Sequence, residues 1–373
     1  MRRLTGTAAT TIVLGCVTVL AAPTGSVGVA ASGTPPASAR AGVATGTPEP
    51  GVVHGVGPAV RQLRARTPAP GQLVHVRDLP GRQHLWCRGE PPYSGAPTIM
   101  IISGAGDYSL SWRTVQRKLS DHHRVCTYDR AGLGWSSATA TPRTGRHIIP
   151  ELTRLLRAGG IRGPLLIVGH SMGGIYARMF AARHPARIRG MVLIDPGDEH
   201  LGVDISAPAR QALRAGIQGA AQRQLASSRT CATGAYARNL HLLTLDTAFP
   251  PKDARTDRRL LAGRCRIWRT NAAEGSGAAR TWSQARSLGM GRHSLGDQPL
   301  GILVSDAALT FVEDPSLNRE IVSMWRRLQH HQVRLSPVHR FAVAHGSSHA
   351  VMLDRPAQVA AMIRWVISKG STR

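Results

Sequence analysis

The chain lacks the features that a nucleic-acid-binding protein would need. It carries 47 basic against 21 acidic residues, a formal net charge of +26, but only three of the basic residues are lysine, at positions 118, 252 and 369. The arginines are spread along the whole chain, and no helix-turn-helix or zinc-finger pattern accompanies them. We therefore expect no nucleic-acid partner, although such a charge favours peripheral contact with an anionic cell wall or membrane.

Cysteine and aromatic residues are also scarce. No Cys-x-x-Cys motif or His/Cys cluster has the spacing of zinc ligands, so the sequence predicts no metal and no other cofactor. With seven Trp, five Tyr and four Phe, a substrate pocket would be mainly aliphatic. An apolar content of 42% over 373 residues still allows one large globular domain with an insertion, which we expect to be monomeric.

The N-terminus has the composition of an export signal. Arg2-Arg3 is followed by a largely apolar stretch over residues 8–22 and then by small residues that offer several cleavage points. We expect residues 1–31 to be a signal peptide of a secreted protein, and residues 32–72, rich in Ala, Gly, Pro, Ser and Thr, to be a disordered linker. Val13-Leu14-Gly15-Cys16 is similar to a bacterial lipoprotein box, so lipid anchoring at Cys16 is the alternative to free secretion.

Short apolar strands alternate with helices along most of the remaining chain. Strands are predicted over 83–88, 97–102, 124–128, 164–168, 189–194, 300–304 and 339–343, and helices over 112–119, 148–157, 175–183, 320–328 and 356–369. This alternation predicts an α/β fold with a mainly parallel sheet covered by helices on both faces.

The alternation stops between the two parts of this predicted core, which are residues 73–196 and 299–373. Within residues 197–298, Leu213, Ile217, Ala221 and Leu225 recur at four-residue spacing, which is typical of an amphipathic helix. Because open α/β sheets bind ligands beyond the C-terminal ends of their strands, we expect this insertion to be a helical lid. A structural insertion unrelated to the site is the alternative.

The segment Gly169-His170-Ser171-Met172-Gly173 lies between an apolar strand and a helix. Gly-x-Ser-x-Gly in this context predicts a nucleophile elbow, a tight turn that presents the serine hydroxyl above the sheet. A Cβ atom at position 169 or 173 would clash in such a turn, which explains the two glycines. We expect Ser171 to have a strained backbone conformation.

Together with three further motifs, this segment resembles the α/β-hydrolase superfamily, and within it the secreted bacterial serine esterases and lipases. The motifs are Ile102-Ser103-Gly104-Ala105-Gly106, then Tyr128 to Ser136 (YDRAGLGWS), and Gly346-Ser347-Ser348-His349 ahead of Leu353-Asp354-Arg355-Pro356. The resemblance covers residues 73–370 apart from the lid. It implies an eight-stranded sheet, with a helical lid as the insertion, in which the second and fourth strands are neighbours.

Four cysteines follow the predicted signal peptide, at positions 87, 126, 231 and 265. An even number in an exported protein suggests disulfides, and three pairings are open, as are buried free thiols. The neighbouring strands that the resemblance implies make a Cys87–Cys126 bridge feasible, which would leave Cys231 and Cys265 to pair within the lid.

A serine hydroxyl needs a base within hydrogen-bond reach. His349 is the candidate, because it follows the last core strand and has the family's Gly-x-x-His spacing; His345 is its competitor. His170 stands next to the nucleophile but is expected to point away and to pack. The carboxylate that orients the histidine is open between two strand-end residues, Asp195, which we favour, and Asp306.

The remaining expectations concern the oxyanion and the reaction. Asp198 and Glu199 are outside candidates for the acid, and the position of the family's usual acid is occupied here by Leu309. The backbone N–H groups of Met172 and Ala105 are expected to form the oxyanion hole. The resemblance implies hydrolysis of a small-molecule ester through an acyl-enzyme. Lactone, amide or thioester hydrolysis, cofactor-free haloperoxidase or hydroxynitrile lyase chemistry, and a non-catalytic binding protein are the alternatives.

Overall fold

The computed structural model describes residues 67–230, 264–307 and 310–370, with four isolated positions at 253, 256, 257 and 260. The predicted signal peptide with Cys16, nearly all of the predicted linker, and Leu309 lie outside the described residues. None of the described helices combines the length and apolar character needed to span a membrane.

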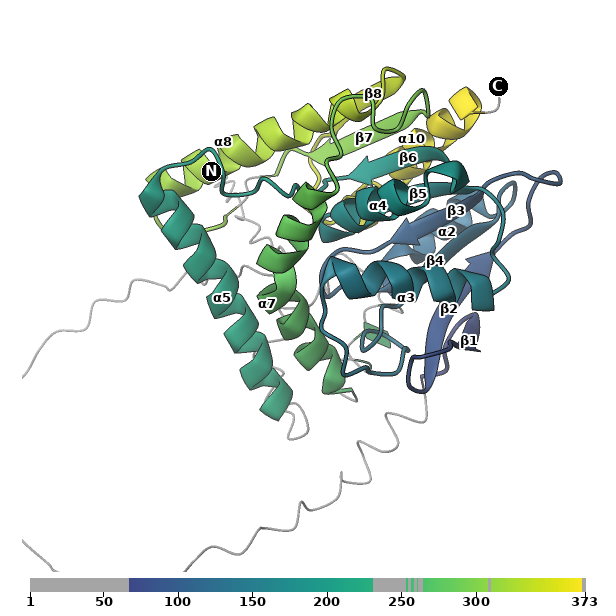
Figure 1. Ribbon diagram of the computed structural model, residues 1–373, viewed down its shortest axis with the longest axis horizontal. Helices are drawn as coiled ribbons and strands as arrows, with labels where there is room; N and C mark the ends of the chain where they lie inside the picture. The colour runs from purple at the N-terminus through teal and green to yellow at the C-terminus, as the bar shows by residue number, and fades with distance from the viewer. Residues whose placement is uncertain are drawn as a thin grey trace, which may run out of the picture.

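Eight strands form one sheet in the order β1-β2-β4-β3-β5-β6-β7-β8 (Figure 1). They are β1 (Gln72–His75), β2 (Arg82–Arg88), β3 (Thr98–Ile102), β4 (Val125–Tyr128), β5 (Leu165–His170), β6 (Ile188–Ile194), β7 (Leu300–Ser305) and β8 (His339–Ala344). The pairs β1–β2 and β2–β4 are antiparallel, and the other pairs are parallel. The predicted α/β fold is thereby confirmed, and β2 and β4 are neighbours as the resemblance implied.

Helices cover both faces of the sheet, and the side chains of β3 show how. Met100 and Ile102 belong to the apolar core under α3 (Gly145–Ala158) and α4 (Met172–Arg183). Ile99 and Ile101 belong to the core under α2 (Arg113–Leu119) and α10 (Pro356–Gly370). Because neighbouring side chains of a strand point to opposite faces, a strand covered on both faces is a nearly continuous apolar run.

The predicted insertion contributes two long helices, α5 (Ala207–Thr230) and α7 (Arg266–Ser287). Figure 1 shows α7 between α5 and the helices that cover the sheet. Leu213 and Ala221 of the predicted amphipathic stripe are buried in α5, whereas Leu225 is 41% exposed. Helix α5 packs with α8 (Pro315–His331) around Leu213, Phe311 and Trp325.

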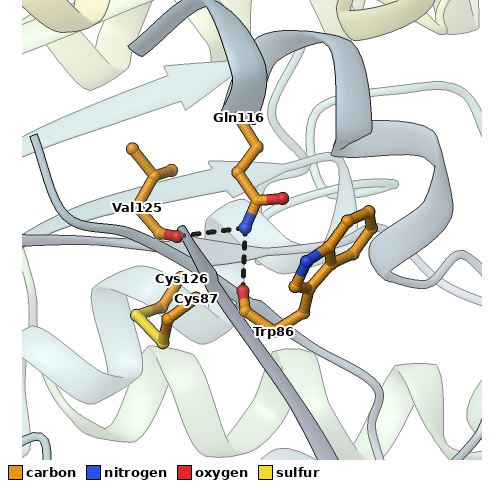
Figure 2. The surroundings of a disulfide bond; sticks show 5 residues. All are labelled: Trp86, Cys87, Gln116, Val125 and Cys126. Carbon is orange, nitrogen blue, oxygen red and sulfur yellow. Dashed lines mark hydrogen bonds between the residues drawn. A yellow bond between two sulfur atoms is a disulfide. The ribbon is translucent and has the colours of Figure 1, made fainter. Parts of the chain in front are cut away.

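A disulfide joins Cys87 of β2 to Cys126 of β4, which are directly paired in the sheet. Figure 2 shows that Gln116 of α2 ties the same two strands together, because its side-chain amide donates to the carbonyl oxygens of Trp86 (2.8 Å) and Val125 (3.0 Å). The predicted Cys87–Cys126 bridge is therefore confirmed. Cys265 is also disulfide-bonded, and its implied partner Cys231 lies outside the described residues.

Candidate active site

Ser171 occupies a sharp turn between β5 and α4. Its φ of 52° and ψ of −123° lie in a backbone region that residues other than glycine rarely adopt. A Cβ on Gly169 would lie 2.7 Å from the Cα of Gly174, and one on Gly173 would overlap the Ile102 carbonyl oxygen and lie 2.7 Å from that of Ser103. The turn thus requires glycine at both positions, the second because α4 begins against the end of β3.

Neighbouring strand ends hold this strained turn in place. The backbone N–H of Ser171 donates to the carbonyl oxygen of Ile194 at the end of β6 (3.1 Å). The carbonyl oxygen of Ser171 accepts from Gly174 and from Gly197, both at 2.9 Å. A conformation that costs about 1–3 kcal/mol persists only where surrounding contacts determine it. Here those contacts come from the end of β6, the residues after it and the first turn of α4.

His349 follows β8 and contacts the carboxylate of Asp195, which follows β6. The His349 Nδ1 atom lies 2.6 Å from Asp195 Oδ2, and Asp195 is fully buried. Two further residues donate to the carboxylate: Ser305, through its backbone N–H and its hydroxyl (3.2 and 2.9 Å), and Gln329 on α8, through its side-chain amide (2.7 Å). The carboxylate is thereby fixed, and it fixes the imidazole in turn.

These hydrogen bonds determine the charge of Asp195. Burial alone would raise the pKa of its carboxyl, but the bonds from His349, Gln329 and Ser305 hold that pKa below its ordinary value. Asp195 is therefore an anion at neutral pH. An anion at Nδ1 selects the imidazole tautomer whose Nε2 atom is free to accept a proton.

The other acid candidates lie elsewhere. Asp306 pairs with the competing histidine, His345 (3.0 Å), and the side chains of this pair are 38% and 82% exposed. Asp198 and Glu199 both face the buried guanidinium of Arg178, with Glu199 at 2.6 Å. The geometry therefore gives His349 one carboxylate partner, Asp195, among the candidates from the sequence.

His170 has a role beyond the packing that the sequence indicates. Its Nε2–H donates to the carbonyl oxygen of His349 (2.9 Å), and the two rings lie 4.7 Å apart. Burial, and then repulsion by His349, lower the pKa of His170 to about 3, so the ring is neutral. The residue that precedes the elbow serine thus anchors the loop that carries His349.

The structure brings Ser171 and His349 to the same end of the sheet, where His170, the neighbour of Ser171, binds the backbone of His349. Both residues are buried, each 5% exposed. Within the described part of the chain, no hydrogen bond joins the hydroxyl of Ser171 to His349. The loop after β3 also lies close to the serine, because a Cβ on Gly104 would be 3.2 Å from the Ser171 Cβ. Ala105 therefore follows directly on a residue that touches the elbow, and Met172 opens α4.

Among the described residues, one group of three has the composition of a metal site: Asp198, Glu199 and His200. Arg178 faces both of its carboxylates, and His200 binds Asp198 (2.9 Å). One guanidinium therefore faces both carboxylates of this group.

Comparison with known proteins gives one family. The alpha/beta hydrolase fold family matches residues 97–285, half of the chain. An uncharacterised protein of Schizosaccharomyces pombe is 31% identical over 153 residues, which cover 35% of this chain and 29% of that protein. The chain spans less than half of the curated relatives that it matches first. Since these include fungal proteins, the comparisons do not support a bacterial source.

Solved structures agree on the fold. A thermophilic esterase from Thermogutta terrifontis superposes with a TM-score of 0.52 at 20% identity, over 80% of this chain and 98% of that one. An epoxide hydrolase mutant from Vigna radiata gives 0.61 at 16% identity, over 80% and 98%. At such identities, these likenesses establish the architecture and leave the substrate open.

Proposed function

The chain belongs to the α/β-hydrolase fold family, and we propose that it is a serine hydrolase that cleaves esters through an acyl-enzyme intermediate. The observation that carries this proposal is the fixed His349–Asp195 pair, 2.6 Å apart, next to a strained serine turn. Families on this fold differ in the residue at the elbow. A serine there favours acyl transfer over the carboxylate chemistry of dehalogenases and epoxide hydrolases.

In the proposed first half-reaction, Ser171 Oγ attacks the ester carbonyl carbon while His349 Nε2 takes the hydroxyl proton. The imidazolium that forms is stabilised by the Asp195 anion at Nδ1. The backbone N–H groups of Met172 and Ala105 stabilise the negative oxygen of the tetrahedral intermediate, each contributing about 3 kcal/mol. His349 then gives its proton to the leaving alkoxide, and the acyl group remains on Ser171.

In the second half-reaction, His349 takes a proton from water, and the resulting hydroxide attacks the acyl carbon. Collapse of the intermediate breaks the bond to Ser171 Oγ, which recovers the proton from His349, and a carboxylic acid leaves. Oxygen and hydrogen balance with water as the only co-substrate. The Ser171–His349 hydrogen bond that this route requires would form as substrate binds.

A panel of p-nitrophenyl esters of rising acyl length, assayed on the purified protein, tests this proposal. We expect turnover of at least one ester, preceded by a burst of about one nitrophenolate per active site. In Ser171→Ala, kcat should fall by about 10⁴-fold or more. Turnover that survives in Ser171→Ala would contradict the proposal.

We further propose that the chain is exported, with residues 1–31 as the signal and lipid attachment at Cys16 as the alternative. The Cys87–Cys126 disulfide supports an oxidising compartment. N-terminal sequencing of the mature protein from the host tests this. A mature N-terminus at Met1 would contradict export.

A further inference from the structure

A buried ion pair between two distant parts of the chain forms hydrogen bonds with the loop that follows β3. Arg130 belongs to the loop after β4, and Glu274 belongs to α7 in the insertion. The Arg130 Nε atom lies 2.7 Å from Glu274 Oε1, and Nη2 lies 2.9 Å from Oε2. Arg130 is 2% exposed and Glu274 is 1% exposed. A paired arrangement of this kind fixes direction as well as distance.

Both side chains also form hydrogen bonds with the loop backbone. Arg130 Nη1 donates to the carbonyl oxygen of Ser103 (2.7 Å), and Nη2 donates to that of Gly104 (2.5 Å). Glu274 Oε2 accepts from the backbone N–H of Gly106 (3.1 Å). The peptide groups on both sides of Ala105 are therefore held by one ion pair.

These hydrogen bonds determine where the N–H of Ala105 points. In a trans peptide the C=O and N–H bonds point in opposite directions. Because the Gly104 carbonyl faces Arg130, the Ala105 N–H faces away from Arg130. Gly104 itself lies against the elbow, since a Cβ there would be 2.9 Å from His170 Nδ1 and 3.2 Å from the Ser171 Cβ.

Helix α7 is docked against this region by more than the ion pair. Gly106, at φ +69°, leaves room for the side chain of Asn271, and Gly132, at φ +90°, leaves room for that of Thr270. Both residues lie one turn or so before Glu274 on α7. The helix thus packs closely against two loops at positions where the chain has glycine. This packing places Glu274 next to the loop that follows β3.

We infer that Arg130 and Glu274 are positioning residues that hold the Ala105 N–H as an oxyanion donor, so that helix α7 of the insertion is part of the catalytic apparatus. This inference rests on the proposed ester hydrolysis. A buried ion pair contributes little to net stability because desolvation offsets its attraction. Here the ion pair binds three backbone groups of one loop, so its role is to position that loop.

The experiment compares Glu274→Gln with Glu151→Gln. Glu151 forms a second buried pair, with Arg143 (2.8 Å), and its side chain makes no recorded bond to residues 103–106 within the described chain, so it is a matched control. Esters and the corresponding thionoesters are assayed, because a sulfur in place of the carbonyl oxygen makes poor use of oxyanion donors. A merely structural defect would lower both rates together.

For Glu274→Gln we expect kcat on the ester to fall at least 10-fold, KM to change less than twofold, and the ester-to-thionoester ratio to fall at least fivefold. Glu151→Gln should leave that ratio unchanged. Arg130→Lys, which keeps the charge but loses the paired geometry, should behave like Glu274→Gln. An unchanged ratio in both Arg130→Lys and Glu274→Gln would overturn the inference while leaving ester hydrolysis intact.

Hydrogen exchange gives a readout that does not depend on activity. In Glu274→Gln, the amides of residues 104–106 should exchange at least 10-fold faster than in the unmodified chain, and in Glu151→Gln they should not. Unchanged exchange there would overturn the inference. Wild-type protein that turns over no ester would instead overturn the proposed function, and the catalytic role of the ion pair with it.

Discussion

Asp195 and Asp306 both end strands of the sheet, yet they have opposite surroundings. Asp195 is buried and receives hydrogen bonds from three residues, whereas Asp306 pairs with His345 at the surface. The burial and the partners of a carboxylate decide whether it can hold an imidazolium in place.

Asp195→Asn should therefore lower kcat on an active ester by about 10⁴-fold, because the amide favours the wrong tautomer of His349. Asp306→Asn should change kcat less than about threefold, since a surface pair contributes little. Steady-state kinetics on both variants checks this. The reverse order of effects would assign the acid to Asp306.

Asp107 gives a pH dependence of stability. Burial raises its pKa from 3.8 to about 6, although Ser111 and Tyr108 donate to it. Since the folded state holds this proton more tightly than the unfolded state, the contribution of Asp107 to stability falls as the pH rises from about 4 to about 7.

Asp107→Asn has no proton to lose at this position. The free energy of unfolding of the variant relative to wild type should therefore rise by about 3 kcal/mol over that pH range. Urea unfolding at a series of pH values measures the difference. A difference independent of pH would show that the carboxyl titrates normally.

At the scale of elements, the junction of β5 and α4 depends on backbone approach. In Gly173→Ala the new Cβ would meet the carbonyl oxygens of Ile102 and Ser103. Backbone atoms at the end of a buried strand cannot move aside, so we expect a loss of about 2 kcal/mol or more in stability and most of the ester turnover. Gly163→Ala is the control, because nothing lies within 4 Å of its Cβ position. Similar melting temperatures for the two variants would contradict this account.

The disulfide acts on the antiparallel edge of the sheet, where β2 joins β4. It links residues 39 positions apart. Cys87→Ala/Cys126→Ala should lower the free energy of unfolding by about 3 kcal/mol. Because Gln116 still bridges the two strands, the folded double variant should keep its ester kcat within about twofold. A large loss of kcat in the folded variant would contradict this expectation.

At the scale of the whole molecule, the sequence predicts what depends on local pattern. Strands β3 and β5 are buried at every position and mostly apolar, and the elbow is visible as two glycines around a serine. Strand β1 has no such signal, since it is a mostly exposed edge strand. Its first residue, Gln72, falls within residues 32–72, for which the sequence predicts a linker. Many of the buried residues of helix α7 are small, such as Ala272, Gly277 and Ala278, so few large apolar side chains mark its buried face.

The site shows the same division. Ser171 and His349 could be named from motifs, but the choice between Asp195 and Asp306 depends on which carboxylate contacts the imidazole of His349. Glu274 is separated from Arg130 by 144 positions and belongs to no motif. Contacts of this kind arise from packing of the insertion on the core, which spacing along a chain does not encode.

Reaction with a fluorophosphonate, followed by peptide mass spectrometry, tests the central claim that Ser171 is an activated nucleophile. We predict one phosphonyl group per molecule, on the peptide that contains Ser171, and none on Ser171→Ala or on heat-unfolded protein. Folded protein that stays unlabelled, or that is labelled at another residue, would contradict the account.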